Sequence, residues 1–355
     1  MNKIRLAVVG ATGLVGRTVL KVLEEKNLPI DEYVFFASSN SAGKKLNFMN
    51  KEYIVCELNE QSFDSGFNYA IFSAGGSTSK KYAPIAVSKG CIVVDNSSAF
   101  RMDENVPLVV PEVNSEEIKN NQGIISNPNC STIQAVVALK PLDDKYNIKR
   151  IVYSTYQAVS GAGRNGVLDL ENGIKDYNQH ESYIDSICNK NNTTTSNYEL
   201  AKFNYPIFSN CLPHIDVFLE NGYTKEEEKM INETRKILKK PNLRITATTV
   251  RVPVFNSHSE AINIEFENDF DMDELINTLS NAPGIILEDN LLKNPQNVTN
   301  PIYPLAINAS GKNEVFVGRI RRDYSVKSGI NIWVVADNIR KGAAANAVQI
   351  VEKML

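Results

Sequence analysis

The sequence is poor in residues that cross-link a chain or anchor it in a bilayer. Its five cysteines are scattered over 355 residues without a CxxC pair, so we expect neither a disulfide framework nor a structural zinc site. No apolar run has the length of a membrane span. The opening MNKIRLAVVGATG lacks the basic region and hydrophobic core of a signal peptide. These absences favour a cytoplasmic protein that holds no metal and contacts no membrane.

Basic residues are not in excess either. The 38 Lys and Arg against 41 Asp and Glu give a net charge of −3, whereas a nucleic-acid-binding protein more often carries a strong positive charge. Hydrophobic residues make up 43% of the chain, enough for a large core, and the length exceeds one typical domain. We therefore expect two domains and no nucleic-acid partner.

The first part of the chain alternates short apolar runs with helical stretches. The elements expected here are Lys3–Val9, Val15–Lys26, Tyr33–Ala37, Phe67–Phe72, Lys80–Lys89 and Cys91–Val94. Strand, helix, strand in this rhythm is typical of a parallel sheet covered by helices on both faces. The pattern predicts a Rossmann-type α/β domain over residues 1–129.

After residue 129 the pattern changes to long strands separated by helices. We expect helices at 131–139, 225–239 and 272–281, and strands at 150–159, 242–252, 259–267, 314–321 and 330–336. This order suggests an α+β domain around a mixed sheet over residues 130–337, with a polar, irregular stretch at 171–204. The last segment, 338–355, is expected to be an amphipathic helix that completes the first domain.

Three glycines stand at the turn between the first strand and the first helix. Gly10, Gly13 and Gly16 form GxxGxxG, a variant of the dinucleotide fingerprint. Glycines there let the backbone turn sharply and let a pyrophosphate approach the helix N-terminus, whose free N–H groups favour anions. A tight turn without a ligand is the alternative, but the flanking strand and helix favour a nucleotide.

The end of the second strand bears on the choice between NAD and NADP. An NAD enzyme usually places a carboxylate there for the ribose 2′-hydroxyl. This chain has Ser38, Ser39, Asn40 and Ser41 instead, followed by two lysines at 44–45. Hydroxyl and ammonium groups suit a 2′-phosphate, so NADP is expected, although a solvated polar loop remains an alternative for each side chain.

Cys130 is the candidate nucleophile. It stands in SNPNCSTIQAVVAL, where Pro128 and Asn129 end the preceding strand and a helical pattern begins. A helix N-terminus stabilises a thiolate, and a thiolate attacks carbonyl carbons. On its own a lone cysteine is more often a buried structural residue, which is how the other four are read.

A cysteine nucleophile needs a partner that handles protons, and the chain has only three histidines. His180 lies in the polar stretch and His214 follows a proline. His258, in RVPVFNSHSEAINIEF, lies between two expected strands and close in sequence to Arg251. We favour His258 as general acid/base, with a surface or core histidine as the alternative.

Anionic substrate groups require cationic anchors. Arg101 follows the carboxyl end of a strand, where ligands collect in parallel sheets. Arg251 has a fork suited to a carboxylate. Glu226 and Lys229 lie three apart on one helix and can face one site, although an exposed ion pair is the simpler interpretation of these two.

Taken together, these segments resemble aspartate-β-semialdehyde dehydrogenase, in the family's order and over nearly the whole chain. The matching segments are GATGLVG at 10–16, SAGG at 73–76, DNSSAFRM at 95–102, NPNCST at 127–132, YQAVSGAG at 156–163, the helix around Glu226 and Lys229, RVPVFNSHSE at 251–260, VGRIRRD at 317–323 and WVVADNIRKGAAANA at 333–347. In combination, NPNC, QAVSGAG and RVPV…H are highly specific and outweigh the simpler alternatives above.

The resemblance implies a Rossmann domain with a catalytic and dimerisation domain, and a homodimer. It implies reversible conversion of L-aspartate 4-semialdehyde, phosphate and NADP to 4-phospho-L-aspartate and NADPH through a cysteine thioester. That reaction lies on the route to lysine and diaminopimelate, methionine, threonine and isoleucine.

The resemblance also assigns roles. Cys130 would be the nucleophile and His258 the acid/base, while Gln157 would position the substrate. Glu226 and Arg251 would hold its amino and carboxylate ends, and Arg101 and Lys229 would bind phosphate. Residues expected to contact NADP are Gly10, Thr12, Gly13, Leu14, Val15, Gly16, Asn40, Ser41, Ser160, Gly161 and Asn338.

One departure and two rivals remain. Many relatives have an arginine where this chain has Asn40, which softens the NADP preference, although Lys44 and Lys45 can compensate. One rival is a reductase of N-acetylglutamyl phosphate, against which the Glu226 helix and the QAVSGAG loop argue. The other is a silent nucleotide-binding paralogue, which would be expected to have lost Cys130, Gln157 or His258.

Overall fold

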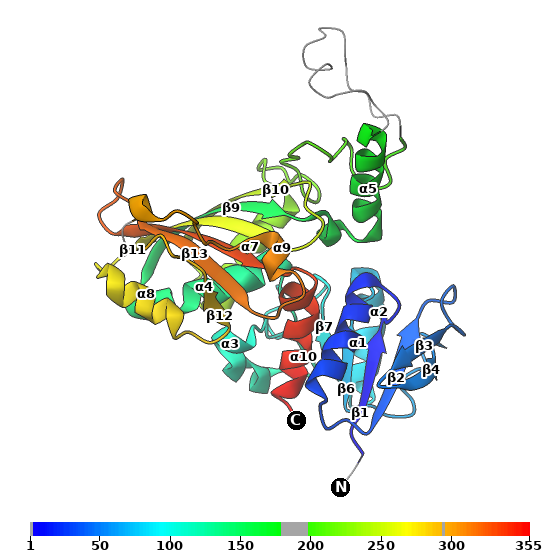
Figure 1. The fold of residues 1–355 in the computed structure, drawn as a ribbon. Helices are drawn as coiled ribbons and strands as arrows, with labels where there is room; N and C mark the ends of the chain where they lie inside the picture. The colour runs from blue at the N-terminus through cyan, green and yellow to red at the C-terminus, as the bar shows by residue number, and fades with distance from the viewer. Residues whose placement is uncertain (1–2, 179–197, 293–294) are drawn as a thin grey trace.

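The computed structural model describes residues 3–178, 198–292 and 295–355. Within them the chain forms two six-stranded sheets and one two-stranded sheet. Figure 1 shows the first sheet and its helices on one side of the molecule and the second sheet on the other, with both termini beside the first. His180 and Cys188 lie outside the described residues.

The first sheet is parallel throughout, as the alternating pattern predicts. Its order is β5-β2-β1-β6-β7-β8. The strands are β1 (Arg5–Val9), β2 (Glu32–Ala37), β5 (Cys56–Glu57), β6 (Tyr69–Phe72), β7 (Ile92–Asp95) and β8 (Ile124–Ser126). Buried side chains on both faces pack against helices that include α1 (Leu14–Lys26) and α2 (Gly76–Ser88). This explains why the strands are almost continuously apolar.

A short hairpin follows β2 and was not anticipated from the sequence. It consists of β3 (Lys45–Phe48) and β4 (Lys51–Ile54), paired antiparallel. Phe48 and Tyr53 pack edge-on against Phe35 of β2. The hairpin therefore extends the core beside the loop that follows β2.

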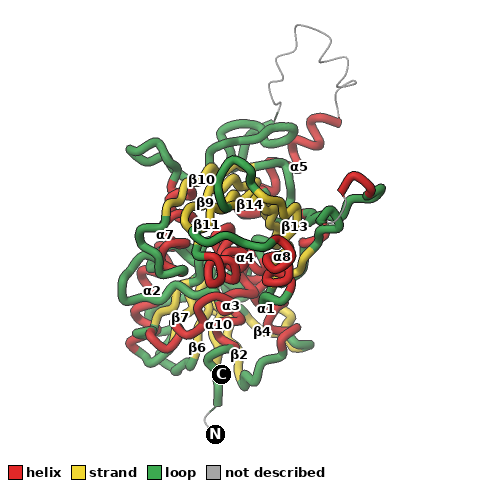
Figure 2. Tube along the Cα trace, turned by 90° about the vertical axis from the view of Figure 1, so that its left-hand side faces the viewer, coloured by secondary structure: helices red, strands yellow, loops and turns green. Residues whose placement is uncertain are grey.

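The second sheet is mixed, as expected, with the order β10-β9-β11-β14-β13-β12. Its strands are β9 (Ile148–Gln157), β10 (Arg244–Arg251), β11 (His258–Phe266), β12 (Ile285–Leu287), β13 (Val315–Arg322) and β14 (Gly329–Ala336). One face packs against α4 (Cys130–Tyr146), α7 (Lys225–Ile237) and α8 (Met272–Ser280), which share its largest apolar core. Figure 2 shows α4 and α8 between this sheet and the first domain, so the opposite face points away from the first domain.

The remaining described helices and turns before the C-terminal segment lie outside these two sheets. They are α3 (Pro111–Asn114), the 3-10 turns Ser115–Asn120, Val159–Ala162 and Pro295–Asn297, α5 (Arg164–Asn178) and α9 (Ala306–Ala309). Among the described residues no helix is both long and apolar enough to span a membrane.

The C-terminal segment returns to the first domain but does not form the single expected helix. A π-helical turn, η4 (Arg340–Ala344), precedes α10 (Ala345–Glu352). The wider turn is visible in the bonds from Gly342 N to Asp337 O and from Ala344 N to Ile339 O. Apolar residues of α10 lie in the same core as α1 and β1. Turns of this kind often mark functional sites, and this one lies against Cys130.

Candidate active site

Cys130 is the first residue of α4, directly after the loop that leaves β8. The side chain of Asn129 caps the helix by accepting from Ser131 N at 3.0 Å and Thr132 N at 3.2 Å. The side-chain nitrogen Nδ2 of Asn129 donates to Glu226 Oε1 at 2.9 Å. The predicted helix start at Cys130 is therefore correct, and the cap that fixes it reaches a second candidate residue.

The resting thiol is not the stabilised thiolate that a helix start alone would give. Burial, and to a lesser degree the Glu226 carboxylate, raise the pKa of Cys130 to about 12 against the opposing effects of Arg251, Arg101 and the Ser131 backbone. Desolvation outweighs the helix dipole here. The sequence predicted a thiolate stabilised by the helix start, and that expectation was wrong.

The π-helical turn supports Cys130 from behind. A methyl group added at Gly342 would lie 2.8 Å from the Cys130 Cβ and 3.2 Å from its Cα. The neighbouring Lys341 is fully buried and donates to both oxygens of Glu112, at 2.8 and 2.7 Å. Only glycine allows η4 to approach the nucleophile this closely.

His258, at the start of β11, is fully buried. Its Nδ1 accepts from the Ala158 backbone N–H at 3.0 Å, so in the neutral ring the proton is assigned to Nε2. Nε2 has no partner among the described residues. Burial and the Arg251 charge keep the pKa of His258 well below its usual value. The ring is therefore neutral at physiological pH, with one N–H free for a ligand.

Arg251, at the end of β10, lies beside this ring. Its Nη1 donates to Ala158 O at 2.6 Å, and its Nε is buried without a partner in the described structure. A Cβ at Gly161 would lie 2.9 Å from Arg251 Nη1 and 3.2 Å from His258 Nε2. Gly161 thus keeps open the space in front of both candidate groups.

Glu226 bonds to two other predicted site residues, Gln157 and Lys229. Gln157 Nε2 donates to its Oε1 at 3.3 Å, and Lys229 Nζ donates to its Oε2 at 3.2 Å. Lys229 also pairs with Asp216 at 2.7 Å. Burial opposes ionisation, but Lys229, Asn129 and Arg251 together lower the pKa of Glu226. Because Glu226 is buried, the exposed ion pair was the wrong interpretation.

Arg101 is held by a partner that the sequence did not indicate. Its Nη1 pairs with Glu233 Oε1 at 3.0 Å, and its Nε donates to Asn127 O at 2.9 Å. Glu233 also accepts from Asn129 N at 2.6 Å. Glu233 lies two helical turns after Glu226, and this i, i+7 spacing on α7 was the available signal. Arg101 is thereby fixed near the Cys130 thiol, whose pKa it lowers.

The glycine turn has the geometry of an anion site. Gly10 has φ +85°, and a Cβ there would lie 2.3 Å from Ser73 O. A Cβ at Gly16 would lie 2.1 Å from Gly10 O. Gly13 is the N-cap of α1 and supplies no side-chain bond to the first turn. Thr12, Leu14 and Val15 surround this bare helix start, which fits a pyrophosphate.

The loop after β2 presents the expected polar groups. Asn40 is exposed and Ser41 half-buried. Lys44 Nζ lies 3.5 Å from Ser41 Oγ, whereas Lys45 pairs with Glu52 of the hairpin at 2.9 Å. Lys44 is therefore the lysine available for a 2′-phosphate.

Two further predicted cofactor residues contact each other. Ser160 Oγ lies 3.1 Å from Asn338 Nδ2, and Asn338 Oδ1 accepts from Ser257 N at 2.9 Å. This links the QAVSGAG loop, the segment before His258 and the start of η4. The remaining described histidine, His214, stacks on Phe218 at 4.3 Å.

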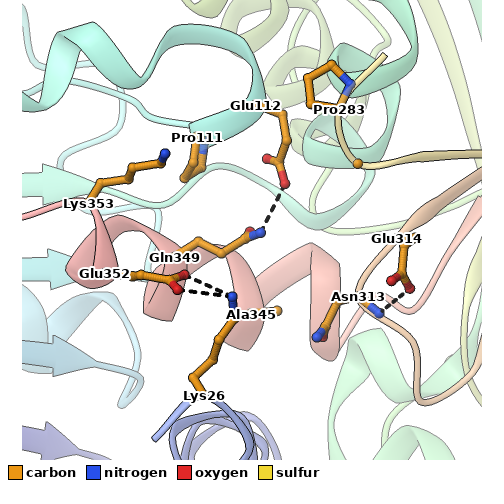
Figure 3. A pocket seen from close by; sticks show the side chains of 11 residues that line it. Lys26, Pro111, Glu112, Pro283, Asn313, Glu314, Ala345, Gln349, Glu352 and Lys353 are labelled. Carbon is orange, nitrogen blue, oxygen red and sulfur yellow. Dashed lines mark hydrogen bonds and ion pairs between the residues drawn. The ribbon is translucent and has the colours of Figure 1, made fainter. Parts of the chain in front are cut away.

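One pocket of about 700 Å³ lies elsewhere on the domain boundary. Figure 3 shows Glu112 pointing toward Gln349, and Lys26 paired with Glu352. Glu112, the partner of Lys341, lines this pocket, but none of the residues predicted to bind substrate, phosphate or cofactor does.

Known proteins share both halves of this arrangement. The family described as "Semialdehyde dehydrogenase, NAD binding domain" matches residues 5–121, and "Semialdehyde dehydrogenase, dimerisation domain" matches residues 139–341. Aspartate-semialdehyde dehydrogenase of Aquifex aeolicus is 54% identical over 353 residues, covering 99% of this chain and 98% of the relative. That of Bacillus subtilis is 47% identical and covers 99% and 97%.

Solved structures agree. The crystal structure of aspartate semialdehyde dehydrogenase II from Vibrio cholerae has a TM-score of 0.87 and 45% identity, covering 99% of this chain and 98% of its own. A structure of the Vibrio enzyme complexed with ASA has the same TM-score at 44% identity, covering 100% and 98%.

Proposed function

Because this chain belongs to the aspartate-semialdehyde dehydrogenase family, we propose that it converts L-aspartate 4-semialdehyde and phosphate reversibly to 4-phospho-L-aspartate with NADP. The product serves biosynthesis of lysine and diaminopimelate, methionine, threonine and isoleucine. The observation that carries the proposal is the convergence on one thiol of Arg101, Arg251 and Glu226, the charged groups whose fields act on Cys130.

Cys130 is the nucleophile in this proposal. The thiol loses its proton as its sulfur bonds to the aldehyde carbon, and the former carbonyl oxygen gains a proton, which gives a thiohemiacetal. Loss of hydride from that carbon and of the proton from its hydroxyl group leaves a thioester, and bound NADP would accept the hydride. A phosphate oxygen then attacks the thioester carbon, and the C–S bond breaks to release the acyl phosphate and the thiolate. Covalent attachment divides one difficult step into two easier ones and holds the carbon in place.

His258 handles the protons. In the resting tautomer its Nε2–H is available to donate to the substrate oxygen as negative charge develops there. Taking a proton at Nε2 requires the other tautomer, in which the bond from Ala158 N is broken. The bond from the Ala158 N–H to Nδ1 therefore favours the acid role.

The substrate is a short amino acid with two charged ends. Arg251, with a buried and unpaired Nε, suits its carboxylate, and Glu226 suits its ammonium. Gln157, bonded to Glu226, positions the bound substrate. Arg101 and Lys229 are the proposed phosphate anchors, already oriented by Glu233 and Asp216.

NADP supplies the hydride acceptor when bound. The bare start of α1 over residues 10–16 would hold its pyrophosphate, and Asn40, Ser41 and Lys44 would face its 2′-phosphate. Ser160, Gly161 and Asn338 would contact the part nearer Cys130. Without an arginine at position 40, discrimination against NAD rests on weaker contacts.

A homodimer is the proposed assembly, with residues 1–129 and 338–355 as the nucleotide domain and 130–337 as the catalytic and dimerisation domain. The sheet face turned away from the first domain is the proposed interface. Tyr156 is 39% exposed there and packs on Trp333 at 5.4 Å, a typical interface pairing. The reducing cytoplasm is the proposed location, since none of the four described cysteines is bonded to another.

One assay tests the function. NADPH formation is followed with aspartate semialdehyde, with and without phosphate, and with N-acetylglutamate semialdehyde in parallel. The proposal expects phosphate-dependent turnover of the first substrate and little of the second. Preference for the acetylated substrate would favour the related reductase, and nucleotide binding without any turnover would identify a silent paralogue.

A further inference from the structure

Glu260 is a buried acid that the proposed mechanism does not use. It lies on β11 two residues after His258, so both side chains are on the same face of the strand. Its side chain is fully buried. In the sheet it is paired with Thr155 of β9 on one side and Val334 of β14 on the other. The carboxyl group therefore lies inside the molecule, next to the catalytic ring.

No cation in the described part of the chain pairs with this carboxyl group. Neither of its oxygens has a hydrogen-bond partner among the described residues. The charged group that acts on it is Glu226 of α7, another acid, and Tyr153 of β9 is the titratable group that feels its charge. The Tyr153 hydroxyl is already engaged, 3.1 Å from Thr234 Oγ1. An ionised Glu260 would thus be an isolated buried charge, which proteins rarely tolerate.

A matching unpaired acceptor lies above the same strand. Gln134, one helical turn after Cys130 on α4, donates from Nε2 to His258 O at 3.3 Å. Its Oε1 is buried and receives no hydrogen bond from any described residue. Two acceptors cannot bond to each other unless one carries a proton. A proton on Glu260 would supply the donor that Gln134 lacks.

We propose that Glu260 is kept as a neutral carboxylic acid that donates to Gln134 Oε1 and acts as a positioning residue for His258. The chain of contacts runs from Glu260 to Gln134 and from Gln134 to the His258 backbone, tying β11 to the first turns of α4. The catalytic consequence rests on the proposed function, whereas the protonation state does not.

The protonation state has a signature in the pH dependence of stability. Burial and the Glu226 charge raise the pKa of Glu260 well above its usual value. The stability that the neutral acid contributes is complete below the pKa of the unfolded chain and is lost as pH rises through the raised pKa of the folded chain. Glu260→Gln, which is neutral at every pH and has an N–H to donate, should escape that loss.

The first experiment compares the wild type with Glu260→Gln by urea denaturation from about pH 5 to about pH 9. The variant should gain stability relative to the wild type as pH rises, and an infrared difference spectrum should show a protonated-carboxyl band in the wild type that is absent from Glu260→Gln. Glu265→Gln, on the same strand and paired with Lys149, is the control and should keep both the carboxyl band and the wild-type dependence of stability on pH. Parallel pH profiles with no carboxyl band would overturn the proposal.

The second experiment tests positioning. Glu260→Gln should keep kcat within about threefold of the wild type, while Glu260→Leu, which has no donor, should lower kcat by at least tenfold, roughly the effect of a displaced catalytic group. KM should change much less than kcat. Equal activity of the two variants would contradict the positioning role. If the wild type has no activity at all, the proposed function fails while the stability and infrared results still decide the state of Glu260.

Discussion

Two polar clusters lie near the nucleophile, one around Lys341 and one around His258, and they differ in how completely their buried atoms are bonded. The ammonium of Lys341 donates to Glu112, to Gln349 at 2.9 Å and to Asn346 at 3.2 Å. In the other cluster, by contrast, four side chains have buried atoms without partners in the described structure. These atoms are His258 Nε2, Arg251 Nε, Gln134 Oε1 and both Glu260 oxygens.

This difference indicates that the Lys341 cluster stabilises the fold, whereas the His258 cluster takes part in the chemistry. Buried polar groups in folded proteins are nearly always satisfied, so several unsatisfied atoms around one point need an explanation. A ligand explains His258 and Arg251, which face the space that Gly161 leaves open, and a proton explains Glu260. The Lys341 cluster needs neither and holds η4 against Cys130. Substitutions in the Lys341 cluster should lower stability. Substitutions of Cys130 or of the groups around it should change catalysis, substrate binding or thiol reactivity.

The largest effect is expected for Cys130→Ser. A hydroxyl is a far weaker nucleophile here, so kcat should fall by about 10⁴ or more. The fold and the glycine turn are untouched, so NADPH binding, followed by fluorescence titration, should stay within about twofold. Loss of NADPH binding together with turnover would instead indicate a structural cysteine.

Lys341→Met should damage stability rather than chemistry. It leaves the partly buried Glu112 carboxylate without its cation, a loss of up to about 3 kcal/mol in the free energy of unfolding by urea titration. Adding Glu112→Gln should recover much of this loss, because the unpaired charge is then gone. A double variant as unstable as the single one would show that Lys341 does not act through this pair.

Arg251→Lys should act on the substrate. Replacing the fork by a single ammonium removes a bidentate contact with the carboxylate, so KM for aspartate semialdehyde should rise about 100-fold. The melting temperature should change little. Unchanged KM with lowered kcat would move Arg251 from substrate binding to another role.

The smallest of these effects is expected for the reactivity of the Cys130 thiol in Glu226→Gln, which should increase. Glu226 raises the pKa of Cys130, whereas Arg251 lowers it. Removing the carboxylate should therefore lower the thiol pKa and speed alkylation of Cys130 at fixed pH, by up to about tenfold. Arg251→Met should slow it. Peptide-resolved mass spectrometry is required, because Cys56 and Cys211 are exposed, and equal rates in all three proteins would exclude this electrostatic coupling.

Much of the fold follows from periodicity. The strands of the parallel sheet are continuous apolar runs, and β1, β2, β6 and β7 lie within a few residues of their expected bounds. The β3–β4 hairpin was missed because its strands are short and polar. The helix at Cys130 runs past Pro141 to Tyr146 instead of ending at residue 139, since its buried face continues. The π turn was missed because hydrophobic periodicity does not report hydrogen-bond register.

The site was predictable where motif and chemistry agreed, and less so where charges pair over long sequence separations. Cys130, His258 and Arg251 were found in this way, and the structure places them near one another, while their roles stay a prediction. Glu233 lies 132 residues from Arg101 and Lys341 lies 229 residues from Glu112, so no local pattern indicated either pair. The thiol pKa was predicted in the wrong direction because desolvation depends on the packed structure.

The two faces of strand β11 have different surroundings. His258, Glu260 and Ile262 point inward, and the alternate residues Ala261 and Asn263 lie on the proposed subunit contact. Adjacent residues of this strand therefore have different proposed roles, one in subunit association and one in proton transfer. Because these residues share one backbone, a substitution at Ala261 or Asn263 that displaces the strand would also displace the His258 ring.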